Sequence, residues 1–75
     1  MFYVQVVYMD SKGAGCMRGF SNEALLDKFL DRLRRDADIK NHQGESIGQV
    51  WSDSHSGGRG KWRWIYDQDK AVYGT

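Results

Sequence analysis

The feature of this sequence that most constrains its fold is one helix with a single apolar stripe. Between residues 22 and 37 the apolar side chains recur as they do on one face of an α-helix. Ser21 is the expected N-cap, and Phe20 is placed to pack against the first turn. The stripe comprises Leu25, Leu26, Phe29, Leu30, Leu33 and Ala37. Such a helix needs one partner layer, and one face of a sheet would provide it.

Three further stretches have the composition of β-strands. Residues 2–9 (FYVQVVYM) are apolar on both faces, which predicts a central strand. Residues 45–53 (ESIGQVWSD) and 60–67 (GKWRWIYD) follow the helix and should form an antiparallel hairpin. We therefore expect a single small α+β domain, residues 1–75, with a two-layer β-α-β-β fold. One amphipathic helix would pack on a three-stranded, largely antiparallel sheet, whose first two strands could pair in parallel.

The last strand alternates between two kinds of side chain with a period of two. One face carries Trp62, Trp64 and Tyr66, and the other carries Lys61, Arg63 and Ile65. We expect the aromatic face to pack under the helix, with Trp51 beside it across the hairpin and the cations outside. One short helix cannot cover all of these rings, so part of the aromatic surface should stay exposed.

The remaining segments are predicted to be connections. Residues 10–20 (DSKGAGCMRGF) are rich in glycine where a strand leads into a helix, but their spacing fits neither the dinucleotide-binding nor the P-loop pattern. We expect a flexible connection there and a polar connection at 38–44 (DIKNHQG). The tail 68–75 (QDKAVYGT) should either add a few paired residues or lie loose.

Composition bounds the class of protein. A single cysteine, Cys16, excludes an intramolecular disulfide and fits a reducing, cytoplasmic setting. The net charge of +1 argues against a strongly basic nucleic-acid binder. The apolar residues 2–9 are too few to span a membrane, and no targeting segment accompanies them. His42 and His55 stand far from Cys16 in sequence, so we expect neither a metal site nor a cofactor.

An enzymatic role has little support in these residues. Cys16 could act as a nucleophile only if the fold brought a base such as His42 or His55 beside it. Asp53, Ser54 and His55 are adjacent in sequence, whereas the members of a catalytic triad meet through the fold. We therefore predict no catalytic residues, and a cysteine-dependent enzyme is only the third hypothesis.

The segment 56–64 (SGGRGKWRW) is the most positive stretch and also holds two tryptophans. Aromatic and arginine side chains are enriched at binding hot spots, so we predict a non-enzymatic module that binds another protein, with a homodimer as one form. The predicted partner-binding residues are Arg59, Lys61, Trp62, Arg63, Trp64, Trp51 and Tyr66. The alternative is single-stranded nucleic acid bound by the hairpin 56–66. In size and layout, though in no motif, the chain resembles small phage and mobile-element inhibitors such as anti-CRISPR proteins, which favours an inhibitor or adaptor.

Overall fold

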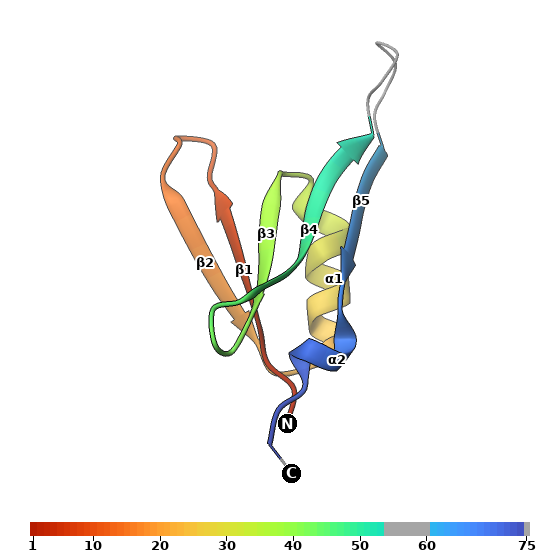
Figure 1. Ribbon diagram of the computed structural model, residues 1–75. Coiled ribbons are helices and arrows are strands. Elements are labelled where there is room, and N and C mark those ends of the chain that lie inside the picture. Colours follow the sequence, from red (N-terminus) through yellow and green to blue (C-terminus); the bar gives the residue numbers. More distant parts are fainter. Residues whose placement is uncertain (54–60, 75) are drawn as a thin grey trace.

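A five-stranded antiparallel sheet with a helix across one face organises this small α+β domain (Figure 1). The computed structural model describes residues 1–53 and 61–74. The strands lie in the order β2-β1-β3-β4-β5, and every neighbouring pair is antiparallel. In chain order the elements are β1 (Val4–Met9), β2 (Gly15–Phe20), α1 (Glu23–Leu33), β3 (Ala37–Asn41), β4 (Ser46–Asp53), β5 (Lys61–Tyr66) and α2 (Gln68–Ala71).

The prediction of an α+β fold is confirmed, but three strands and one helix were too few. The glycine-rich residues 10–20 were expected to be a flexible connection, and they instead turn back to form β2. Asp10 fixes that turn, because its Oδ1 accepts hydrogen bonds from the backbone N–H groups of Lys12 and Ala14 at 2.8 and 2.9 Å. Gly13 takes the left-handed conformation with φ of 82°, which glycine adopts without strain.

The polar segment after the helix is also a strand. β3 pairs with β1 on one side and with β4 on the other, both antiparallel. The two strands that were expected to pair in parallel, β1 and β4, are therefore separated by β3 and are not neighbours. Asn41 ends β3 and shapes the turn into β4, since its Oδ1 accepts from the N–H groups of Gln43 and Glu45 at 3.0 and 2.9 Å. The expected antiparallel hairpin is confirmed as β4 and β5; its loop, 54–60, lies outside the described residues.

Helix α1 is shorter than predicted at both ends. Asn22, rather than Ser21, is the N-cap, and its side chain accepts a hydrogen bond from the N–H of Leu25 at 3.2 Å. The helix stops at Leu33 because Arg34 adopts the left-handed conformation, with φ of 49°. Ala37 consequently belongs to β3, and Leu25 of the predicted apolar stripe is 59% exposed.

The core lies between α1 and one face of the sheet. Val4 and Val6 of β1 are fully buried, as expected for an internal strand, and pack with Ile39 of β3. Leu26 and Leu30 of α1 cover them, and Val50, Tyr66 and Ala71 extend the core toward β5 and α2. The tail is paired rather than loose: Phe2 forms a bridge with Val72, and the N–H of Tyr3 donates to the carbonyl of Ala71 at 3.0 Å.

Candidate functional site

The hairpin of β4 and β5 divides the predicted partner-binding residues between the two faces of the sheet. Strand register places Trp62 opposite Ser52 and Trp64 opposite Val50, on the face that α1 covers. Lys61 and Arg63 point to the other face, called here the open face, and both are exposed. Arg59 lies outside the described residues.

The position of Trp51 corrects one expectation. Trp51 lies directly opposite Arg63, so the two side chains share the open face, and Trp51 is not beside the aromatic residues of β5. The sequence prediction placed it on the aromatic face, but direct neighbours in an antiparallel pair share a face and the register had not been fixed.

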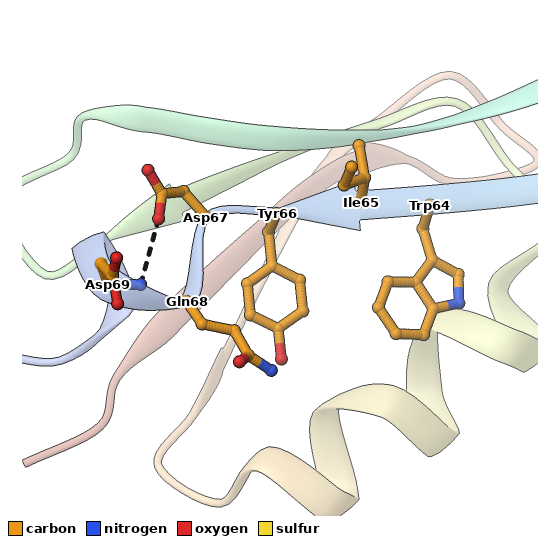
Figure 2. A pocket seen from close by; sticks show the side chains of 6 residues that line it. All are labelled: Trp64, Ile65, Tyr66, Asp67, Gln68 and Asp69. Atoms are coloured by element: carbon orange, nitrogen blue, oxygen red, sulfur yellow. Dashed lines mark hydrogen bonds between the residues drawn. The ribbon is translucent and has the colours of Figure 1, made fainter.

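The rings of Trp64 and Tyr66 contribute to packing, as Figure 2 shows by their direction toward α1. They stack with centroids 5.8 Å apart. The indole Nε1 of Trp64 donates to Asp31 Oδ1 at 2.9 Å, and the hydroxyl of Tyr66 donates to Asp27 Oδ1 at 3.2 Å. Tyr66 is only 9% exposed. Burial, with the Asp27 carboxylate beside the hydroxyl, raises the pKa of Tyr66 to about 12.

A shallow hollow lies beside these rings, where β5 ends and α2 begins (Figure 2). It is lined by Trp64, Ile65, Tyr66, Asp67, Gln68 and Asp69. Gln68 Nε2 donates to Glu23 Oε1 of α1, and Asp67 caps α2 by accepting from the N–H of Asp69 at 3.1 Å. The polar groups on this side therefore tie α1 to β5 and α2.

The open face carries a second hollow, with a volume of about 430 Å³. Val7, Met9 and Gly15 line it from the hairpin of β1 and β2, and Trp51 with Gln49 lines it from β4. Three apolar side chains stand exposed on this face: Met9 at 60%, Met17 at 66% and Ile65 at 61%. The open face thus joins Trp51, Lys61 and Arg63 with apolar residues that the sequence analysis had not selected.

Charge on the open face is mixed. Arg63 Nε lies 3.2 Å from Asp53 Oδ2, so this cation has a carboxylate partner. Asp36 and Asp38 also line the hollow, and Asp38 Oδ1 accepts from the hydroxyl of Ser46 at 3.5 Å. The basic face expected from the sequence is therefore partly neutralised by neighbouring acids.

A third feature, the groove between α1 and β2, was missed because residues 10–20 were expected to be a flexible connection. Phe29 of α1 lies at its centre, 5.0 Å from the ring of Phe20 and 5.9 Å from that of Tyr8, centroid to centroid. The guanidinium of Arg18 lies over the Phe29 ring at 5.3 Å. No apolar alternation marks residues 15–20 as a strand, so the sequence held no clear signal for this groove.

Cys16 lies in this groove, half-buried, with its Sγ 3.8 Å from the carbonyl oxygen of Ala14. The hollow around it is lined by Tyr8, Asp10, Ser11, Phe29, Arg32, Leu33 and Arg35. Within the described residues His42 is not among them; its ring stacks on Tyr73 instead, with centroids 4.0 Å apart. His55, the other histidine considered as a base, lies outside the described residues.

Residues 1–53 and 61–74 contain no group of three His, Cys, Asp or Glu side chains that could hold a metal ion. They also contain no helix long and apolar enough to cross a membrane. In comparisons with known proteins, the chain matches no protein-family model, no curated protein and no solved structure.

Proposed function

We propose that this chain is a non-enzymatic module that binds another protein through the open face of its sheet, as an inhibitor or adaptor would. The observation that carries the proposal is the hollow between Met9 and Trp51, flanked by exposed Met17 and Ile65. Apolar side chains gathered on the surface of a small domain are typical of a docking surface. Lys61 and Arg63 would supply the polar rim that surrounds the apolar centre of an interface.

Single-stranded nucleic acid is the alternative partner of the same face. Trp51 could stack on a base beside Lys61 and Arg63. Phosphates, however, would meet the carboxylates of Asp36 and Asp38, and Arg63 is already paired with Asp53. Since affinity for nucleic acid comes largely from neutralising phosphates, these acids favour a protein partner.

The test is affinity capture from cell lysate with matched surface variants. Ile65→Lys and Met9→Lys place a charge on the open face, whereas Val72→Lys makes the same change at an apolar residue, 54% exposed, in the C-terminal tail. We expect a captured protein to be retained by the parent chain and by Val72→Lys. Its recovery should fall about tenfold or more with Ile65→Lys and Met9→Lys, because a buried unpaired ammonium opposes association.

Circular dichroism of each variant separates loss of binding from loss of fold. A partner that all folded variants retain equally would overturn the proposal for the open face. A titration of tryptophan fluorescence with single-stranded DNA and RNA tests the alternative, which predicts quenching that weakens steeply with salt. Sedimentation tests whether the partner is a second copy of this chain: in that case the parent chain should be a dimer and Ile65→Lys a monomer.

A further inference from the structure

Strand β2 forms one outer edge of the sheet and has a hydrogen-bonded neighbour, β1, on one side only within the described chain. An edge strand presents unpaired backbone N–H and C=O groups, and natural edges are usually protected by several charges, a proline or a bulge. β2 has six residues, GCMRGF, of which only Arg18 is charged and none is proline. The opposite edge, β5, carries Lys61 and Arg63 and is in addition tied to α1 through Trp64 and Tyr66.

Beside this edge runs the groove between α1 and β2, named here the α1–β2 groove. It consists of two adjoining hollows of about 300 and 360 Å³, both of which Phe29 and Arg32 line. Phe20 and Leu25 form the apolar wall of the hollow near the start of α1. In Figure 1 the helix lies behind β4 and β5, while the hairpin of β1 and β2 extends to the side of it.

The charges of α1 are separated between its two flanks. Glu23, Asp27 and Asp31 recur at intervals of four and hold Gln68, Tyr66 and Trp64, respectively, on the side of β5 and α2. Lys28 and Arg32 line the groove, together with Arg18. Farther along the groove Arg35 is the fourth cation, and its guanidinium donates to the carbonyl of Met9 at 3.2 Å.

Few carboxylates of this chain lie near these cations. Among the described residues Asp10 is the one carboxylate that lines either hollow, and its Oδ1 already accepts the two turn hydrogen bonds. Arg18, Lys28 and Arg32 form no ion pair within residues 1–53 and 61–74. The groove therefore offers four cations against one carboxylate, next to an open strand edge.

We propose that the α1–β2 groove binds an extended acidic segment of another protein, which adds to the sheet as a further strand beside β2. The backbone of the segment would pair with the free edge, and its carboxylates would meet Arg18, Lys28 and Arg32. The groove lies on the opposite face of the sheet from the hollow at Trp51, so this site is separate from the open face and is tested separately.

The register of β2 defines the sequence such a segment should have. Cys16, Arg18 and Phe20 point to the side of α1, because they lie opposite Tyr8, Val6 and Val4. Residues of the added strand on that side should be acidic. On the open face the neighbours would be Gly15, Met17 and Gly19, so the residues in between should be apolar. The expected ligand alternates acidic and apolar side chains.

The probe is a fluorescein-labelled peptide of about ten residues in which glutamate and valine alternate, with a lysine–valine peptide as its counterpart. Fluorescence anisotropy should show binding of the glutamate peptide alone, weakened by added salt. The double variant Lys28→Glu, Arg32→Glu should lower the affinity about tenfold or more, because attraction becomes repulsion. The double variant Lys61→Glu, Arg63→Glu changes the net charge equally at the other edge and should bind as the parent chain does.

Hydrogen exchange followed by NMR tests strand addition. The bound peptide should slow exchange of the amides in Gly15–Phe20 that point away from β1, which are those of every second residue, and leave the amides of Lys61–Tyr66 unchanged. If the double variant Lys28→Glu, Arg32→Glu fails to fold, Arg18→Gln takes its place as the test, because glutamine keeps most of the side-chain stem over Phe29. The affinity for the glutamate peptide should then fall about threefold. Equal binding of both peptides, equal effects of both double variants, unchanged exchange in β2, or binding of a thymidine oligonucleotide in place of the peptide would each overturn the proposal.

Discussion

Replacing Gly48 by alanine would place a methyl group against the backbone of β5, where Gly48 lies opposite Tyr66. The added Cβ would meet the carbonyl oxygen of Ile65 and would lie 2.6 Å from both Cα and Cβ of Tyr66. Carbon atoms in favourable contact are about 3.5–4.0 Å apart, so the two strands or the Tyr66 side chain must move by about 1 Å. The atoms in the way belong mainly to the backbone of β5, which cannot swing aside as the end of a flexible side chain can.

The expected loss in the free energy of unfolding is the sum of three contributions. Overpacking of this kind costs about 1–3 kcal/mol. Lengthening one backbone hydrogen bond next to Gly48 would add about 1 kcal/mol, and the smaller entropy of the unfolded alanine chain returns about 0.4–1 kcal/mol. The expected loss is about 2–3 kcal/mol. A domain of this length is stable by about 4–11 kcal/mol, so the variant should fold but with a large part of its stability gone.

Urea denaturation followed by tryptophan fluorescence measures the change. With a denaturant slope of about 1 kcal/mol per M, the midpoint should fall by about 2–3 M. Gly15→Ala is the matched control, because Gly15 also lies in a strand but its added Cβ would meet nothing within 4 Å. That control should be unchanged or slightly more stable. A free energy of unfolding for Gly48→Ala within 0.5 kcal/mol of the parent, on the order of a neutral surface change, would refute the close approach of β4 and β5.

Three further changes test individual contacts. Arg34→Gly should raise the free energy of unfolding by about 0.5–1 kcal/mol in urea denaturation, because glycine removes the left-handed strain at φ of 49°, and a loss of stability would contradict that account. Burial raises the pKa of Tyr66 from its ordinary value of 10.0 to about 12, so its contribution to stability is complete below pH 10 and is lost as the pH rises toward 12. The free energy of unfolding of Tyr66→Phe should fall less over this range than that of the parent chain, and identical pH profiles would contradict this account. Asp31→Ala should lower the free energy of unfolding by about 0.5–1 kcal/mol in the parent chain, and should have no effect in Trp64→Phe, which lacks the donor. In this double-mutant cycle, additive losses would show that the two side chains are not coupled.

The elements that the sequence predicted correctly are those with a strong periodic pattern. The burial of Leu26 and Leu30 follows from helical spacing in α1, and that of Val4 and Val6 follows from the apolar character of both faces of β1. The period of two in β5 predicted the split between Trp64 and Arg63 correctly. A periodic pattern arises where one side of a helix or strand is buried, so it predicts which residues belong to the core.

The strands β2 and β3 were missed for a different reason. β2 contains Gly15 and Gly19, which weaken strand propensity, and most of its side chains are exposed. β3 is short, and its only apolar residues are Ala37 and Ile39. Their stability comes from pairing with β1, whose two apolar faces implied neighbours without identifying them. Trp51 was placed on the wrong face because β4 is irregular at Ile47: the register against β3 shifts there, and Ile47 and Val50 are both buried.

Both candidate surfaces have one geometric cause. Neighbouring strands are about 4.8 Å apart, so the outer strands of this five-stranded sheet lie about 19 Å apart, whereas a helix with its side chains is about 10–12 Å wide. α1 can therefore cover only part of one face and leaves the other open. Glu23, Asp27 and Asp31 attach one flank of the helix to β5 and α2. On the other flank Phe29 contacts Phe20 of β2, and the α1–β2 groove runs beside this contact. Because these acids bond to β5 and α2, they do not pair with Lys28 and Arg32 on the other flank of the helix, within the described chain. The result is a positive groove beside the free edge of β2.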